Sequence, residues 1–234
     1  MEVLKNYNQV IDARKIMRKL NISFVDSPLK YFLRRLKLIK TIEIGDVQKS
    51  WDVYNFIKFS KKNVRKEDSI LDIGCYSSEF ILSLSKLGYK NITGIDLNKG
   101  IYKMPFQEKI NYKVANFMDY QPKNTMYKVV SAVSVIEHGF NKLKFLKSMS
   151  KIIIPGGFLL ISFDYWDDKI DTSKTKLFNM DWNIFSKKEM QKFIKDAEKH
   201  NFFPLKNPSF KCYDKAISHV GYNYTFGMII FVKK

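Results

Sequence analysis

The chain has 234 residues with a formal net charge of +18, and 45% of its residues are hydrophobic. This length suits one domain with a substantial core, no apolar run approaches the ~20 residues that cross a bilayer, and Cys75 and Cys212 alone make neither a disulfide framework nor a zinc site. Only five of the 41 basic residues are arginine, the better partner for phosphate, so the charge is a weak sign of nucleic-acid binding. Because the N-terminus lacks the apolar segment of a secretory signal, we expect a cytoplasmic protein.

Residues 1–65 are expected to form a helical cap or extension ahead of the main domain. Within them, the segment PLKYFLRRLKLIK places five apolar side chains on one helical face, opposite most of its basic residues: Leu29, Phe32, Leu33, Leu36 and Ile39. Such a helix most often covers a core and keeps its charges in water, and this is the arrangement we expect. A helix lying on a membrane surface has the same pattern, so peripheral membrane contact stays the alternative.

Residues 66–234 alternate strand-like and helix-like patterns, which is typical of a mostly parallel sheet with crossover helices. Helices are predicted from Ser78 to Leu87, from about 141 to 151, and from 187 to 200, the last opened by a capping box of Ser186 and Glu189. The predicted strands are SILDIG (69–74), NITGIDL (91–97), INYKVA (110–115), YKVVSAVSVI (127–136), PGGFLLISF (155–163) and TFGMIIFV (225–232). We therefore expect a single Rossmann-like, doubly wound α/β domain with a seven-stranded sheet and an antiparallel C-terminal strand.

The loop after the first of these strands has one glycine where a dinucleotide site needs three. Gly74 is followed by Cys75, Tyr76 and two serines, so few backbone amides could approach a pyrophosphate. A cofactor without phosphates asks less of this loop, and it needs an acidic residue at the end of the next strand to accept ribose hydroxyls. Asp96, 22 positions after Gly74, is placed for that role.

The order of four motifs, LDIGC, GIDLN, SVIEHG and PGGFLLIS, resembles the class I S-adenosylmethionine-dependent methyltransferases over about residues 65–165. The tract after the fifth strand also resembles small bacterial members associated with surface-polysaccharide or other small-acceptor methylation. The resemblance implies S-adenosylmethionine as cofactor and S-adenosylhomocysteine as product. By match, it assigns cofactor contacts to Asp72, Gly74, Cys75, Tyr76, Asp96, Leu97, Asn116, Phe117 and Ser134.

Within that assignment, Asp72, Gly74 and Tyr76 line the methionine part and Asp96 holds the ribose. Leu97 packs on the adenine, whose amino edge and face lie against Asn116 and Phe117. The family usually has glycine where Tyr76 and Ser78 stand, although a serine at a helix start can still bind a carboxylate. Taken singly, Gly74 is also compatible with a simple turn, Asp72 with a cap and Phe117 with the core.

Glu137 and His138 end the fourth predicted strand, beside the expected position of the methyl group, because open parallel sheets bind ligands where the strand order reverses. His138 is the natural general base for a hydroxyl acceptor, since its unperturbed pKa lies near 6.5, and Asp164 is the second catalytic candidate. The alternative is that His138 only fixes the loop. Glu137 and His138 lack a third ligand, so no metal site is predicted.

The stretch from Phe163 to Ser186 combines aspartates with two tryptophans, which suits a sugar, and Glu137, Tyr165 and Trp166 are the predicted acceptor contacts. The motifs of base methyltransferases, an Asn/Asp-Pro-Pro-aromatic turn or a Pro-Cys pair, do not follow the fourth strand. We therefore expect methylation of a sugar, glycan or other small-molecule hydroxyl or amine, and nucleic acid is disfavoured. An RNA methyltransferase using the basic surface and a non-catalytic scaffold with this fold stay open.

Overall fold

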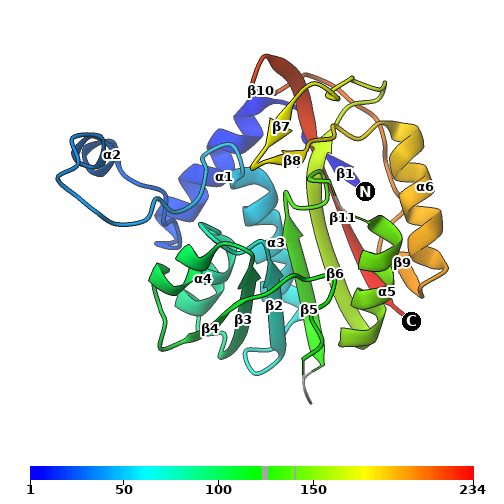
Figure 1. Ribbon diagram of the computed structural model, residues 1–234, viewed down its shortest axis with the longest axis horizontal. Helices are drawn as coiled ribbons and strands as arrows, with labels where there is room; N and C mark the ends of the chain where they lie inside the picture. The colour runs from blue at the N-terminus through cyan, green and yellow to red at the C-terminus, as the bar shows by residue number, and fades with distance from the viewer. Residues whose placement is uncertain (123–125, 140) are drawn as a thin grey trace.

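The computed structural model describes residues 1–122, 126–139 and 141–234, and its centre is a twisted sheet (Figure 1). Within the described residues, nine strands form this sheet in the order β1-β11-β6-β5-β2-β3-β4, with β9 and β10 also pairing with β11. The strands are β1 (Glu2–Val3), β2 (Ser69–Ile73), β3 (Asn91–Asp96), β4 (Ile110–Val114), β5 (Tyr127–Val133), β6 (Ile153–Tyr165), β9 (Phe202–Pro204), β10 (Ile217–His219) and β11 (Tyr222–Lys233). Strands β4, β3, β2, β5 and β6 run parallel and β11 is antiparallel to β6, which confirms the predicted fold class.

The sheet holds more strands than the seven predicted, because the additional ones are short. Strands β1, β9 and β10 have two or three residues each, too few for an alternating pattern to show in the sequence. The PGG motif at the start of the predicted fifth strand forms a bulge within β6. Tyr127 of β5 pairs with Ile153, and Val129 pairs with Phe158, so the residues between them on β6 leave the ladder.

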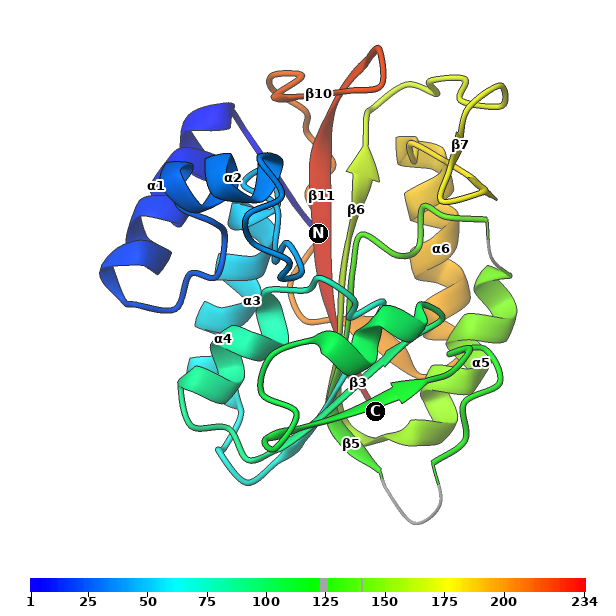
Figure 2. The same cartoon turned by 60° about the vertical axis from the view of Figure 1, so that its left-hand side comes forward.

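Helices cover both faces of the sheet, as expected of a doubly wound fold (Figure 2). Helices α1, α3 and α4 pack in one core cluster through Val10, Phe56 and Phe80, and α5 and α6 pack in the other through Phe145 and Met190. The capping box opening α6 is confirmed, with Ser186 and Glu189 exchanging hydrogen bonds. The helices are α1 (Tyr7–Lys19), α2 (Pro28–Arg35), α3 (Ser50–Asn63), α4 (Phe80–Lys86), α5 (Lys142–Ile152) and α6 (Lys187–Glu198), with a 3-10 turn η1 (Lys99–Lys103) after β3.

The N-terminal residues are joined to the sheet in two ways. Strand β1 pairs antiparallel with β11, and Leu4 N–H donates to the carbonyl of Phe226 at 2.9 Å. Helices α1 and α3 share the hydrophobic cluster that includes Ile70 of β2. The boundary predicted at residue 65 falls between α3 and β2, and as a domain division it stays a prediction.

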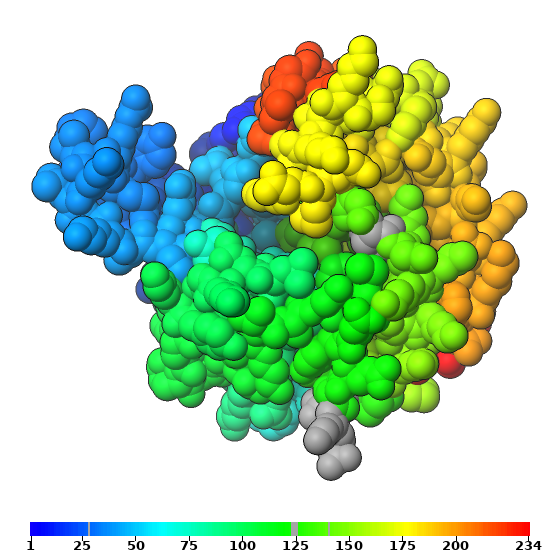
Figure 3. Space-filling view, viewed as in Figure 1, coloured from blue at the N-terminus to red at the C-terminus, as the bar shows by residue number. Residues whose placement is uncertain are grey.

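The prediction that the apolar face of the PLKYFLRRLKLIK segment covers a core is wrong. Helix α2 ends at Arg35, five residues earlier than predicted, and stands away from the rest of the molecule (Figures 1 and 3). Leu29, Phe32 and Leu36 are exposed on it. Leu33 and Ile39 of the predicted face are half-buried, and Ile39 lies beyond the end of the helix. A periodic pattern carries no information on which surface lies opposite.

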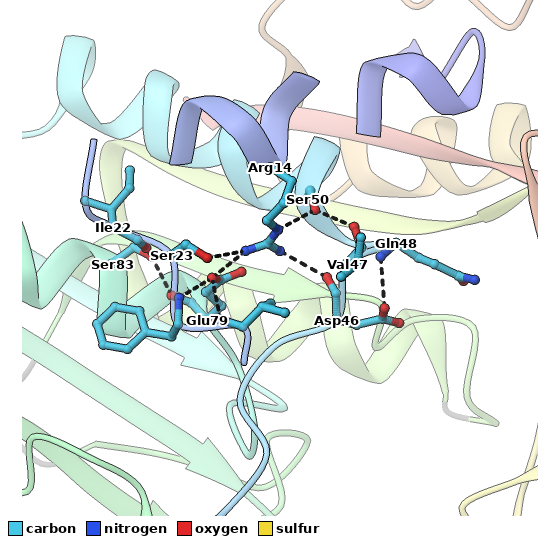
Figure 4. Close-up of polar contacts among 11 residues, drawn as sticks. Arg14, Ile22, Ser23, Asp46, Val47, Gln48, Ser50, Glu79 and Ser83 are labelled. Atoms are coloured by element: carbon cyan, nitrogen blue, oxygen red, sulfur yellow. Dashed lines mark hydrogen bonds and ion pairs between the residues drawn. The ribbon is translucent and has the colours of Figure 1, made fainter. Parts of the chain in front are cut away.

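A buried ion pair fastens α1 to the loop between β2 and α4 (Figure 4). Arg14 of α1 donates to Glu79 Oε1 at 2.6 Å, and the two side chains are 3% and 1% exposed. The same oxygen accepts the backbone N–H groups of Phe24 at 2.5 Å and Val25 at 3.3 Å. Arg14 also donates to Ser50 Oγ at 2.9 Å, which joins the start of α3 to the same network.

Candidate active site

The loop after β2 takes its shape from two residues with left-handed backbone, Gly74 (φ +70°) and Ser77 (φ +65°). A Cβ at position 74 would lie 2.7 Å from Val135 Cγ2, so the loop after β5 approaches too closely for any residue but glycine. Tyr76 is not in the left-handed region, and the glycine usual there is therefore not required by the backbone. The departure from the family pattern leaves the loop conformation unstrained at Tyr76.

Asp96 ends β3 and holds this loop in place. Its Oδ2 accepts the backbone N–H of Tyr76 at 2.9 Å, and its Oδ1 accepts that of Asn98 at 2.8 Å. The Tyr76 ring packs against the backbone of Gly100, where a Cβ would lie 2.7 Å from Tyr76 Cε2. Leu97, the next residue, is 60% exposed at the rim. Asp96 and Leu97 thus lie at the carboxyl end of β3, beside the loop, as their motif predicted.

Asp72 is buried in β2 and only half of its carboxylate is paired. Oδ1 accepts from Ser131 Oγ at 2.6 Å, whereas Oδ2 has no hydrogen-bond partner of good geometry among the described residues. Burial raises the pKa of Asp72 to about 7, and the charge of Asp96 adds to the shift. Cys75 points the other way, into the core against Gly94, and burial raises the pKa of its thiol. Of these two residues, only Asp72 offers a side-chain oxygen that can accept a further hydrogen bond.

Asn116 and Phe117 follow β4 next to the end of β3, since Ala115 N–H donates to the carbonyl of Asp96 at 2.9 Å. Asn116 Oδ1 accepts the N–H of Met118 at 3.0 Å. The Phe117 ring packs edge-on against Phe145 of α5, with centroids 5.7 Å apart. Both residues therefore flank the carboxyl ends of β3 and β4, although their side chains already have partners.

The loop after β5 begins at Ser134, whose backbone is left-handed (φ +51°) and whose N–H donates to the carbonyl of Ser162 at 3.1 Å. It is held from above by a small hairpin of β7 (Lys176–Leu177) and β8 (Met180–Asp181). Gly139 N–H donates to Asp181 O, and Asn183 N–H donates to Glu137 O, both at 2.8 Å. In Figure 3 the surface is recessed between this yellow hairpin and the green segments below it.

Buried charges lie beneath this loop. Asp164 Oδ2 accepts from Trp182 Nε1 at 2.8 Å and Oδ1 from Lys49 Nζ at 3.4 Å. Asp52 of α3 accepts from Ser162 Oγ at 2.8 Å, and burial raises its pKa to about 6 although Lys49 opposes the shift. Burial and the charge of Asp164 raise the pKa of Glu137 well above its usual range, against the opposing charge of Lys49.

His138 is half-buried at the edge of this charged group. Burial lowers its pKa, which outweighs the attraction of Asp164, so the imidazole is neutral at pH 7. Its Nδ1 is buried and has no hydrogen-bond partner among the described residues. Its ring lies 5.3 Å from that of Phe178, an 81% exposed residue at the tip of the β7–β8 hairpin with left-handed backbone (φ +54°). A neutral ring with a free nitrogen can accept a proton.

The structure brings Glu137, His138 and Asp164 together but not Tyr165. Successive side chains of a strand point to opposite faces, and on β6 Asp164 faces α3 while Tyr165 faces α5 and α6. Tyr165 is fully buried, and its hydroxyl donates to the carbonyl of Phe210 at 2.9 Å. Trp166 lies half-buried after the strand, with Lys215 Nζ 5.0 Å above its ring.

Three residues of this region were missed by the sequence reasoning: Lys49, Asp52 and Tyr224, whose hydroxyl interacts with Asp164. Trp182 was included only as one of the two tryptophans of the stretch from Phe163 to Ser186. Asp52 carried a usable signal, because it lies between Trp51 and Val53 in a segment rich in apolar residues, where a carboxylate is costly unless it has partners. Lys49 and Tyr224 lie far apart in the sequence. No local spacing could have joined them.

The largest-volume hollow described lies away from these residues. It has a volume of about 710 Å³ and lies at the opposite, amino-terminal edge of β3 and β4. Within residues 1–122, 126–139 and 141–234, no three His, Cys, Asp or Glu side chains are grouped to hold a metal ion.

A doubly wound sheet of this order is typical of α/β proteins that bind a ligand at the carboxyl ends of their strands, where Gly74, Asp96 and the His138 loop lie. Residues 50–205 match the methyltransferase domain family, and the chain belongs to it, as a class I methyltransferase that uses S-adenosylmethionine.

Curated relatives and solved structures agree with this family. The chain is 29% identical over 110 residues to a mitochondrial ubiquinone biosynthesis O-methyltransferase of Dictyostelium discoideum, covering 40% of this chain and 34% of that protein. It is 27% identical over 144 residues to human EEF1A lysine methyltransferase 2, covering 53% and 61%. The chain thus matches about a third and three fifths of these relatives' lengths. The fold matches an S-adenosylmethionine-dependent methyltransferase from Clostridium acetobutylicum with a TM-score of 0.56 and 11% identity, over 87% of this chain and 96% of that one.

Proposed function

We propose that this methyltransferase methylates a hydroxyl group of a small polar acceptor, and that a sugar or glycan is the acceptor class. The observation that carries the proposal is His138, a neutral imidazole with an unpaired Nδ1 beside buried carboxyl groups and aromatic rings. A hydroxyl must lose its proton during or after its attack on the methyl carbon, so a base is needed in addition to the alignment of the two reactants. The surface-polysaccharide role suggested by the loop after β6 belongs to this same proposal.

The residues at the carboxyl ends of β2, β3 and β4 fit the cofactor. S-adenosylmethionine supplies a methyl carbon made electrophilic by a positively charged sulfonium. The unpaired Oδ2 of Asp72 and the partly exposed carboxylate of Asp96 provide acceptors for its ammonium and ribose hydroxyls, and exposed Leu97 provides an apolar surface for the adenine. The proposed contacts are Asp72, Gly74, Cys75 through its backbone, Tyr76, Asp96, Leu97, Asn116, Phe117 and Ser134.

We assign different roles to the groups around His138. His138 accepts the acceptor's proton. Asp164 has both carboxylate oxygens engaged, by Lys49 and Trp182, so it positions the site instead of serving as the base itself. Glu137 can contact the acceptor through its Oε2, which has no partner of good geometry among the described residues.

Aromatic rings next to His138 support a sugar acceptor. Phe178 is 81% exposed beside His138, and the half-buried ring of Tyr222 packs edge-on against Trp182, which is itself buried. Flat apolar surfaces with adjacent carboxyl groups stack on sugar rings and bind their hydroxyls. Trp166 stays a proposed contact at the edge of this region, whereas Tyr165 lies outside it.

The names of the relatives divide between oxygen and nitrogen acceptors, and an amine acceptor is the second candidate. The neutral His138 favours both, because a protonated amine must also lose a proton before it can attack. An RNA acceptor draws support only from the net charge of +18.

The first test is calorimetry with S-adenosylhomocysteine, because every role above requires the cofactor. Absence of binding at millimolar ligand would favour a non-catalytic scaffold. The second test offers radiolabelled methyl donor with three panels: glycans and sugar nucleotides, lysine-containing proteins and amines, and bulk RNA. We expect label in the first panel. Label confined to the amine panel or to RNA would refute the acceptor class while leaving the cofactor site intact.

A further inference from the structure

The segment from Asp26 to Glu43, called here the arm, leaves the body of the molecule and returns to the point from which it left. On the outgoing side, Phe24 and Val25 donate their backbone N–H groups to Glu79. On the returning side, Gly45 N–H donates to the carbonyl of Ser77 at 2.8 Å. A Cβ at position 45 would lie 2.9 Å from Val25 Cγ2, so the two ends are packed side by side.

Helix α2 of the arm is a defined element despite its distance from the core. Ser27 Oγ accepts the N–H of Lys30 at 3.3 Å, and Asp26 pairs with Arg34 at 2.6 Å and with Lys30 at 2.8 Å. At the other end, Leu38 N–H donates to the carbonyl of Leu33 at 3.0 Å, with the intervening Lys37 left-handed at φ +59°. The helix therefore presents a fixed surface.

That surface is apolar and uncovered. The exposed fractions are 68% for Leu29, 57% for Phe32, 52% for Leu36 and 70% for Leu38. Single exposed apolar residues are ordinary, but several large ones on one short helix mark an interaction surface. Their spacing places Leu29, Phe32 and Leu36 along one side of the helix.

The charges around this surface select the partner. Between Ser27 and Thr41 there are five basic residues and no acidic one: Lys30, Arg34, Arg35, Lys37 and Lys40. Lys30 and Arg34 pair with Asp26, which leaves Arg35, Lys37 and Lys40 as the cations beside the apolar strip. A second copy of the chain would bring the same positive charges and would be repelled. An apolar strip flanked by cations is complementary to a bilayer with anionic headgroups, where the apolar side chains enter the interface and the cations meet the lipid phosphates.

We propose that the arm docks the methyltransferase on the surface of an anionic lipid bilayer through α2 and Leu38. No helix within the described residues is long and apolar enough to cross a membrane, so this contact is made at the surface. The docking is independent of which acceptor the enzyme methylates, and it places the bilayer beside the ends of the arm, which contact the loop after β2.

The experiment measures flotation of the full chain with vesicles of phosphatidylcholine alone and of phosphatidylcholine with about 25% phosphatidylglycerol. We expect partition only onto the anionic vesicles, decreasing as salt is raised. The double variant Phe32→Glu/Leu36→Glu should lose at least tenfold of the partition coefficient. The matched control Leu143→Glu, on exposed α5 surface, should retain it.

A second pair of variants separates the arm from the overall charge. Replacement of Arg35, Lys37 and Lys40 by Gln should reduce partition about a hundredfold. Replacement of Lys187, Lys188 and Lys192 of α6 by Gln removes the same charge and should change it less than threefold. Equal losses in the two triple variants, or equal binding to neutral vesicles, would overturn the proposal.

Two further outcomes would also overturn it. One is concentration-dependent dimerisation that Phe32→Glu/Leu36→Glu abolishes, which would assign the surface to a second copy. The other is tight binding of bulk RNA, abolished by the arm triple variant, with no vesicle binding. Circular dichroism and S-adenosylhomocysteine affinity should match the parent chain in every variant, because α2 packs against neither the core nor the cofactor loop.

Discussion

The ion pair between Arg14 and Glu79 gives the sharpest stability prediction. Arg14→Met keeps much of the volume of the side chain but leaves the Glu79 carboxylate, 1% exposed, without its counter-charge. Removing one partner of a buried pair costs about 3–5 kcal/mol. For a chain of this length, that corresponds to a fall in Tm of roughly 10 °C.

The double variant Arg14→Met/Glu79→Gln decides whether the two residues act as a pair. The amide oxygen of the introduced glutamine would still accept the N–H groups of Phe24 and Val25, and no buried charge would be left, so the double variant should be more stable than Arg14→Met alone. Urea unfolding followed by tryptophan fluorescence gives the free energies. Lys15→Met is the matched control, because Lys15 lies on the same helix in a pair that is 72% and 68% exposed, and it should cost under about 0.5 kcal/mol.

Two results would refute this reasoning. Additive losses from Arg14→Met and Glu79→Gln would show that the two side chains are not coupled. A loss below about 1 kcal/mol for Arg14→Met would show that water reaches Glu79 once the guanidinium is gone.

Four other predictions concern the site. Asp96→Ala should weaken S-adenosylhomocysteine binding at least tenfold in calorimetry, since it removes an acceptor of charged hydrogen bonds, and an unchanged Kd with a native melting profile would exclude Asp96 from the site. His138→Ala should lower turnover about 10²- to 10⁴-fold with the cofactor Kd unchanged, whereas the control His200→Ala should leave turnover unchanged. Wild-type turnover should persist as pH falls to about 6.5 and decline only below it. The reason is that burial lowers the pKa of His138 and only the neutral ring accepts a proton. Burial raises the pKa of Asp72 from 3.8 to about 7, so the folded chain holds this proton more tightly than the unfolded one. The proton's contribution to stability is complete below about pH 4 and is lost towards pH 7. Urea unfolding of Asp72→Asn at about pH 4.5, 6 and 8 should therefore show a flatter pH dependence than that of the parent chain. Phe178→Gly should relieve the left-handed backbone and leave stability equal or higher by about 1 kcal/mol, while raising the KM of the acceptor; an unchanged KM would place the acceptor away from the hairpin.

The sequence predicted those parts of the site that lie at strand ends. Gly74, Asp96 and His138 each stand at or just after the end of an apolar strand, and because parallel strands end at one edge of the sheet, the order of the motifs was enough to place them together. Tyr165 was misplaced for a local reason. The length of β6 and its alternation decide which face a residue takes, and β6 extends two residues beyond the predicted strand end.

The charged group under His138 could not be predicted in this way. Lys49 precedes α3, Asp164 lies near the end of β6 and Tyr224 lies in β11, so their meeting depends on how the N-terminal helices pack on the sheet. The same limit applies to α2, for which the pattern gave the apolar face but not its surroundings. Contacts between distant segments, unlike periodicity, leave no trace at a fixed spacing in a single sequence.

The position of β11 in the sheet has a consequence for how the chain reaches its native state. This strand, the last element in the sequence, pairs with β6 on one side and with β1 and β9 on the other. During synthesis, β6 therefore emerges from the ribosome long before its neighbour and carries an open hydrogen-bonding edge in the meantime. Strand β1 likewise lacks its pairing partner until β11 has been synthesised. Completion of the sheet is thus a late, long-range event, and the interval before it is when the nascent chain is most exposed to aggregation.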